Sequence, residues 1–176
     1  EGPVGIACAQ PGWVLASLVA AWAARRRPIL IDPGLEKEID ALCRIHPGIR
    51  ILADRGEPGG GRVLVADLLA KSEAASAAPP WLVIPGDDEP FAGLYTSGSE
   101  GDNKEIAKQG RQLYRQVAAL LELLALPPSG RVLSFVPPYH MLGFFYGLVL
   151  PLVLGKETVV ATELTGAAMV QLLEKY

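Results

Sequence analysis

The sequence has few cysteines and almost no excess charge. Its two cysteines, Cys8 and Cys43, fit no metal-ligand or redox spacing. We therefore expect no disulfide framework, a reducing cytoplasmic location, and two small buried side chains. Sixteen Lys and Arg residues against 19 Asp and Glu residues give a net charge of −3. This balance provides no general field for nucleic acid or anionic lipid, so any phosphate must be held locally, by a loop.

Long apolar runs are also missing. Trp13–Ala24 is short, and its basic cluster at Arg25–Arg27 follows the run, whereas a signal peptide carries its charges first. Met141–Gly155 is apolar for 15 residues, and Pro151 interrupts it. A spanning helix needs about 20 residues, so we expect no membrane span. Internal repeats and heptad runs are absent as well.

The composition that is present belongs to a globular protein. Half of the 176 residues are hydrophobic and a fifth are charged, with 19 Gly and 15 Pro. This fits one domain, or one lobe of a larger one, with many turns between regular elements. Because the chain starts at Glu1 without Met and stops in an apparent helix at Tyr176, we expect an excised piece of a longer polypeptide.

The first half of the chain alternates between short apolar runs and helical patterns. The first apolar run is typical of a buried strand, and Pro11 after it suits the first turn of a helix. After the second run, Leu35, Ile39 and Leu42 have the spacing of apolar residues on one face of a helix. The predicted elements, in order, are a strand at Val4–Ala9, a helix from Pro11 to about Arg26, a strand at Pro28–Asp32, a helix at Leu35–Ile45, and strands at Arg50–Asp54 and Val63–Ala66. Short connections between such elements predict a parallel sheet covered by helices.

The second half is more regular. It predicts strands at Phe91–Thr96, Lys104–Lys108, Val132–Val136 and Glu157–Ala161, and helices at Gln109–Leu126, Tyr139–Leu154 and Leu164–Tyr176. Asp67–Ala78 is an Ala/Ser-rich linker that ends in two prolines. We therefore predict an α/β fold of mainly parallel sheets, with one portion at 1–80 and a second at 81–176, both belonging to one truncated N-terminal domain.

One polar loop carries the chemistry. In the segment from Tyr95 to Lys104, three hydroxyl residues, two glycines and a lysine directly follow an apolar strand. Glycines let backbone N–H groups converge on an anion, hydroxyls add donors, and Lys104 supplies a charge for a polyphosphate. A polar Gly/Ser hairpin turn is the alternative for this loop taken alone.

Three other motifs fail letter by letter. A Walker loop requires Gly-Lys-Ser/Thr, but Asn103 precedes Lys104 and Glu105 follows it. A dinucleotide fingerprint begins at Gly59 and Gly61, but a leucine stands at the position of its last glycine. A nucleophile elbow fails because Ser97 occupies the place of its first glycine.

The loop resembles the phosphate-loop signature of the adenylate-forming superfamily, which runs Ser/Thr-Ser/Thr-Gly-Ser/Thr-Thr/Glu-Gly-x-Pro-Lys. The matching residues are Thr96, Ser97, Gly98, Ser99, Glu100, Gly101 and Lys104. The resemblance implies that they hold the ATP phosphates. Asn103 replaces the usual Pro, which makes the loop less stiff without removing a ligand. Glu100 replaces the commoner Thr, which removes a hydroxyl donor and adds a negative charge beside the phosphates.

A second stretch resembles the next motif of the same superfamily. Ser134–Gly155 contains a strand, Pro-x-x-His, a Gly, and a helix with Leu-Pro-Leu. The resemblance implies that His140, Gly143 and Phe144 line the acyl-substrate pocket. A structural role for His140 is the alternative. More weakly, Val4–Asp32 looks like the superfamily's early strand, helix and strand. Within the superfamily, Gly101–Leu113 followed by Val136–Gly143 looks most like the ligases of aryl polyene or xanthomonadin pigment clusters.

The resemblance implies an AMP-forming acid–thiol ligase. Such an enzyme activates a small-molecule carboxylic acid with ATP, with Mg²⁺ bridging the phosphates, and passes the acyl group to CoA or to the phosphopantetheine of an acyl carrier protein. The superfamily's later adenine, ribose and lid motifs are absent from this sequence. We therefore expect no catalytic residue within the chain, no activity from it alone, and dependence on the missing remainder of the polypeptide. A non-catalytic phosphate- or nucleotide-binding module and a scaffolding remnant are the alternatives.

Overall fold

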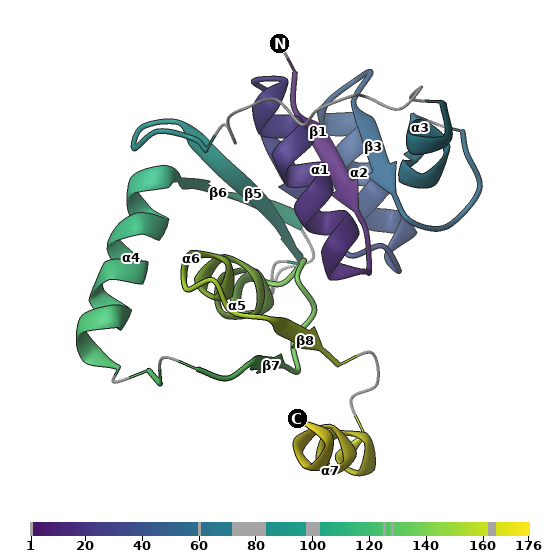
Figure 1. Cartoon of the computed structure of the whole chain (residues 1–176). Helices are drawn as coiled ribbons and strands as arrows, with labels where there is room; N and C mark the ends of the chain where they lie inside the picture. The colour runs from purple at the N-terminus through teal and green to yellow at the C-terminus, as the bar shows by residue number, and fades with distance from the viewer. Residues whose placement is uncertain are drawn as a thin grey trace. The chain divides into compact units, whose positions relative to one another are not determined.

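The computed structural model of the chain describes residues 2–59, 61–71, 84–97, 103–124, 126–127, 129–161 and 165–176. It contains two compact units, Glu1–Gln112 and Leu113–Tyr176 (Figure 1). The first unit holds a six-stranded sheet and the second a two-stranded sheet.

The elements of the first unit follow the predicted alternation of strands and helices. In chain order they are β1 (Val4–Ala7), α1 (Pro11–Ala23), β2 (Pro28–Leu30), α2 (Glu36–Ile45), β3 (Arg50–Ala53), β4 (Arg62–Leu64), α3 (Val65–Lys71), β5 (Pro90–Ser97) and β6 (Asn103–Gln109). Helix α4 (Gly110–Leu123) begins in this unit. Pro11 is the first residue of α1, where an N–H group would have no acceptor within the helix, so its absence costs no hydrogen bond.

The sheet has the order β4-β3-β1-β2-β5-β6. All neighbouring pairs are parallel except β5 and β6, which are antiparallel. The connections from β1 to β2 and from β2 to β3 run in opposite directions along the sheet, so right-handed crossovers place α1 and α2 on opposite faces. All four residues of β1 are buried, as expected for a strand covered on both sides.

One hydrophobic core lies between the sheet and α2. Apolar side chains of the strands meet those of the helix there, and Tyr95 of β5 belongs to the same cluster. The buried members are Ala7, Ile29, Ile31, Ile39, Leu42, Ile49, Ile51, Ala53 and Tyr95. The strand that leads into the predicted phosphate loop is therefore fixed in the core of the first unit.

Helix α1 ends in a Schellman motif that carries an unusual residue. The N–H of Arg26 donates to the Ala21 carbonyl (2.8 Å) and that of Arg25 to the Trp22 carbonyl (2.9 Å). Arg25 has a φ of +53°, the only positive φ of a non-glycine residue among those described. Glycine is the usual residue at this position, because a side chain there costs about 1 kcal/mol.

The second unit contains a short parallel pair of strands beside a helical segment. Its elements after α4 are β7 (Val132–Ser134), α5 (Met141–Phe144), η1 (Phe145–Val149), α6 (Leu150–Val153), β8 (Thr158–Val160) and α7 (Gly166–Lys175). β7 pairs with β8 in parallel, from Val132 opposite Thr158 to Ser134 opposite Val160. The segments α5, η1 and α6 follow one another without a break, and η1 is a π-helical turn.

The predicted fold class is confirmed, with local differences. The strand predicted at Val63–Ala66 is wrong in its second half, because α3 begins at Val65 with Asp67 in its first turn, where a negative charge stabilises a helix. The helix predicted from Tyr139 begins at Met141. The predicted division into 1–80 and 81–176 stays a prediction, and residues 72–83 at that boundary lie outside the described residues.

Candidate functional site

The predicted phosphate loop connects β5 and β6 at the tip of an antiparallel hairpin. The register sets Ser97 opposite Asn103 and Thr96 opposite Lys104. Lys104 is exposed. Gly98, Ser99, Glu100 and Gly101 of the predicted set lie outside the described residues. The structure thus brings the first hydroxyl residue and the lysine of the motif to facing positions of one ladder.

The base of the hairpin is anchored in the core. Leu94 is fully buried and Tyr95 is 5% exposed. Burial, with the negative charge of Glu38 as a second cause, raises the pKa of the Tyr95 phenol. Burial likewise raises the pKa of Glu38, and Asp32 adds to the effect. The strand therefore enters the loop from a rigid position.

A group of charges ties β6 to the rest of the sheet. A Cβ on Gly93 would lie 2.6 Å from Oε1 of Glu105, so the Glu105 carboxylate packs directly over this glycine. Glu105 forms an ion pair with Arg27, the residue before β2, and lies 3.6 Å from Nε2 of His46 at the end of α2. Burial, with the positive charge of Arg27 as a second cause, lowers the pKa of His46. Glu105 thus joins the hairpin to two elements that are distant in sequence.

The predicted acyl-pocket residues lie in the second unit, at the start of its helical segment. His140 is the exposed N-cap of α5, and its ring lies 5.0 Å from that of Tyr139. Gly143 is buried and Phe144 is 0% exposed. Phe144 thus contributes to the interior, and the role of all three residues toward a substrate stays a prediction.

Two glycines let the chain after β7 lie against this helical segment. A Cβ on Gly143 would be 2.0 Å from the Pro137 carbonyl oxygen, and a Cβ on Gly147 would be 2.5 Å from Oγ of Ser134. Spaced four residues apart, the two glycines share one face of the helix. The close approach fixes the turn that presents His140.

The π-helical turn was not predicted. The N–H of Leu150 donates to the carbonyl of Phe145, five residues earlier, just before Pro151 removes a donor from the helix. Such turns occur frequently at functional sites. Pro151 was a sequence signal for an interruption, but not for its type.

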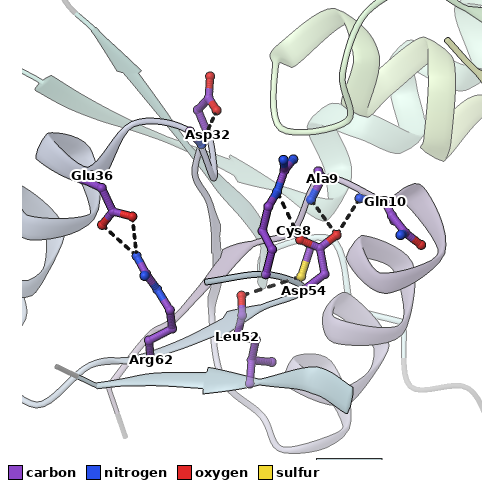
Figure 2. A network of polar contacts seen from close by, with 10 residues as sticks. Cys8, Ala9, Gln10, Asp32, Glu36, Leu52, Asp54 and Arg62 are labelled. Atoms are coloured by element: carbon purple, nitrogen blue, oxygen red, sulfur yellow. Dashed lines mark hydrogen bonds and ion pairs between the residues drawn. The ribbon is translucent and has the colours of Figure 1, made fainter. Parts of the chain in front are cut away.

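A polar network at the carboxyl ends of β1 and β3 was also missed (Figure 2). Asp54, whose side chain is 4% exposed, accepts the N–H groups of Ala9 (2.9 Å) and Gln10 (2.8 Å) just before α1. Nearby, burial raises the pKa of the Cys8 thiol to about 12, so this thiol is not a nucleophile at neutral pH. The only available signal was an Asp at the end of the strand predicted at Arg50–Asp54.

Two further findings concern the described residues alone. They contain no group of three or more His, Cys, Asp or Glu side chains that could hold a metal ion. In the same part of the chain, no helix combines the length and the apolar character needed to cross a membrane.

Comparisons with known proteins identify the family of the chain. A sequence model of the family described as AMP-binding enzyme matches residues 3–176. A curated relative, sulfoacetate–CoA ligase from Cupriavidus necator, is 33% identical over 104 residues, which make up 59% of this chain and 20% of that protein.

Solved structures share the fold. O-succinylbenzoate coenzyme A synthetase from Bacillus subtilis, in complex with ATP and magnesium ion, matches with a TM-score of 0.82 and 16% identity over 99% of this chain and 38% of that chain. A malonyl-CoA ligase bound to methylmalonyl-CoA and AMP matches with a TM-score of 0.75 and 22% identity, over 97% and 37% of the two chains. The chain spans less than half the length of each of these three proteins. Since the family match extends over nearly all of its residues, the chain belongs to the AMP-binding enzyme family, the adenylate-forming enzymes that its loop resembles.

Proposed function

We propose that this chain is the part of an AMP-forming acid–thiol ligase that holds the ATP phosphates. The observation that supports the proposal most directly is the hairpin register, with Thr96 opposite Lys104 at the end of a ladder whose base is buried. A lysine and hydroxyl groups beside a glycine-containing connection suit an anionic polyphosphate. The family membership supports the same chemistry.

The proposed reaction has two steps. An oxygen of the substrate carboxylate attacks the α-phosphorus of ATP, and pyrophosphate leaves, which produces an acyl adenylate. The sulfur of a thiol then attacks the acyl carbonyl carbon, and AMP leaves. In the first step, Lys104 and the loop donors would neutralise charge on the β- and γ-phosphates as the pyrophosphate separates.

Magnesium enters this proposal only as the ion bound by the nucleotide phosphates. The described residues contain no group of three or more His, Cys, Asp or Glu side chains that could hold a metal ion, so no residue of this chain is assigned to the magnesium. Every contribution proposed for this chain comes from its own side chains and backbone donors.

The proposal extends to the acid and the thiol. We propose that His140, Gly143 and Phe144 form one wall of the acyl pocket and that the thiol belongs to CoA or to an acyl carrier protein. Membership of the aryl polyene or xanthomonadin branch stays part of this proposal. We also propose that the chain alone does not turn over, because it spans less than half of its relatives.

Substrate-dependent pyrophosphate exchange by the complete polypeptide tests the proposal, with a panel of aromatic, short and long acids. Lys104→Ala should raise the KM for ATP by about tenfold or more, because a charge-assisted contact to phosphate is lost. Lys108→Ala is the matched control. It lies on the same strand four residues away, about 13 Å from Lys104 at the usual rise, and should leave the KM for ATP unchanged.

Three results would contradict parts of the proposal. An unchanged KM for ATP in Lys104→Ala would remove the phosphate role of the hairpin and favour a different binding function. Exchange above background in the 176-residue chain would show that the fragment suffices. Turnover with acetate-like acids only would exclude the pigment-cluster branch.

A further inference from the structure

A groove of about 530 Å³ opens on the first unit beside the C-terminus of α1. Three consecutive arginines line it, Arg25, Arg26 and Arg27, together with Trp22, Glu89 and Pro90. The described lining residues therefore carry three positive charges and one negative charge, a sum of +2, on a chain whose net charge is −3. Positive charge is therefore concentrated at this groove, although the chain as a whole has a net negative charge.

The three arginine side chains differ in whether they already form an ion pair or a hydrogen bond. Arg27 forms an ion pair with Glu105. Within the described part of the chain, Arg25 and Arg26 have no ion pair or hydrogen-bonded side-chain partner. Of the acidic side chains nearby, Glu89 accepts the N–H of Gly86 (2.7 Å) and Asp88 pairs with Arg111. Two guanidinium groups thus remain at the groove with their donors uncommitted.

The C-terminus of α1 gives one ordinary reason for arginine here. A helix C-terminus carries about half a negative charge, which nearby cations stabilise. One arginine suffices for that purpose, and the run has three. The dipole also does not explain why Arg25 occupies a left-handed position (φ +53°) that favours glycine. Strain that a simple substitution would relieve is an observation that points toward function.

The aromatic residue that lines the groove is held firmly in place. Trp22 is 6% exposed, its Nε1 donates to the Phe91 carbonyl (2.8 Å), and its ring meets that of Phe91 edge-on at 4.7 Å. Pro85 and Pro90, the first residue of β5, also line the groove. A hollow of this volume is within the range of small-molecule sites. The concave shape favours a small ligand over a flat macromolecular surface.

We propose that the groove lined by Trp22, Arg25, Arg26 and Arg27 is a second anion site, which binds a small ligand through phosphate groups. Guanidinium groups present paired donors that match phosphate oxygens. The site lies at the amino end of β2 and β5, whereas the phosphate-loop hairpin tip lies at the carboxyl end of β5. The proposal therefore does not depend on the function proposed for the hairpin.

Calorimetric titration with inorganic pyrophosphate and with ADP, at low and high salt, tests this site on the 176-residue chain. The variants are Arg25→Gly with Arg26→Gln, Lys104→Ala, and Lys37→Gln. Lys37 is an exposed lysine near the start of α2, which follows the carboxyl end of β2, whereas the groove lies at the amino end of that strand; it serves as the matched control. Arg25→Gly suits the left-handed backbone, so loss of folding does not obscure the result.

The double arginine variant should lose one pyrophosphate-binding component, or bind it about tenfold more weakly, while Lys37→Gln should bind like the unaltered chain. Lys104→Ala should keep this component even if it loses another, which separates this site from the hairpin. Equal affinity for pyrophosphate and ADP would identify phosphate alone as the ligand group, and tighter ADP binding would identify a nucleotide. Identical binding by the double variant, or no binding by the unaltered chain, would overturn the proposal.

Discussion

Replacing Gly143 by alanine tests how closely the chain after β7 packs on the helix that carries the predicted acyl-pocket residues. The new Cβ would lie 2.0 Å from the Pro137 carbonyl oxygen and 2.5 Å from that of Val136. Cβ atoms essentially never approach other atoms within 3.0 Å, so the backbone would have to move by at least 1.0 Å, the difference between 3.0 and 2.0 Å. Both neighbours are backbone atoms, so no side-chain rotation relieves the clash.

Two opposing effects set the magnitude. In a helix, alanine is favoured over glycine by about 1 kcal/mol. Forcing close-packed atoms apart typically costs about 1–3 kcal/mol, and more where the backbone itself must shift. We therefore expect Gly143→Ala to lower the free energy of unfolding by roughly 1–3 kcal/mol, the opposite sign to that expected from helix propensity alone.

Urea denaturation followed by far-ultraviolet circular dichroism measures this change. Hydrogen exchange of the amides in 132–161 should show the loss of protection in the second unit. Gly166→Ala is the control, because Gly166 is also a helical glycine and nothing lies within 4 Å of its added Cβ. It should be neutral or stabilising by up to about 1 kcal/mol. A midpoint for Gly143→Ala equal to or above that of the unaltered chain would refute the close packing described here.

Three further predictions concern the first unit. Arg25→Gly should raise the Tm by roughly 2–4 °C, because relief of the left-handed strain is worth about 1 kcal/mol; an unchanged or lower Tm in a calorimetric scan would argue against strain. Because the pKa of His46 is lowered in the folded state, its contribution to stability is full above its unfolded pKa of about 6.5 and is lost as the pH falls through the folded pKa. Urea midpoints should therefore fall between pH 8 and pH 5 more steeply for the unaltered chain than for His46→Gln, and equal slopes would contradict this. Cys8, with a thiol pKa of about 12, should stay unlabelled by iodoacetamide at pH 8 in the native protein, whereas early labelling found by mass spectrometry would show that the thiol is accessible.

Most of the fold could be predicted because its signals are local. Short apolar runs between helical patterns, with few connecting residues, allow little besides a parallel sheet with helices on it. The error at Val65 has a local cause too. Residues 63–71 begin with β-branched and apolar residues that suit a strand and continue into a pattern that suits a helix. In the structure, β4 ends at Leu64 and α3 begins at Val65, which is buried.

The candidate site was predictable only in part, because its supports are distant in sequence. The hairpin follows from a strand, a Gly/Ser-rich loop and a second strand that are contiguous. The pairing of Glu105 with Arg27, and the bonds from Ala9 and Gln10 to Asp54 over 45 and 44 residues, depend on how the strands are ordered in the sheet. Nothing in the local sequence specifies that order.

In the hairpin, the residues that hold the sheet together are distinct from Lys104, the residue predicted to bind phosphate. Tyr95 and Glu105 are paired across the ladder, and they are respectively buried in the core and tied to Arg27. Lys104 directly precedes Glu105 in β6. Because side chains alternate between the two faces of a strand, Lys104 lies on the other face, where it is exposed. A change at Glu105 should therefore loosen the sheet, whereas a change at Lys104 should spare it. Loss of ATP binding in a Lys104→Ala protein with an unaltered Tm would consequently report a lost phosphate contact and not a lost fold.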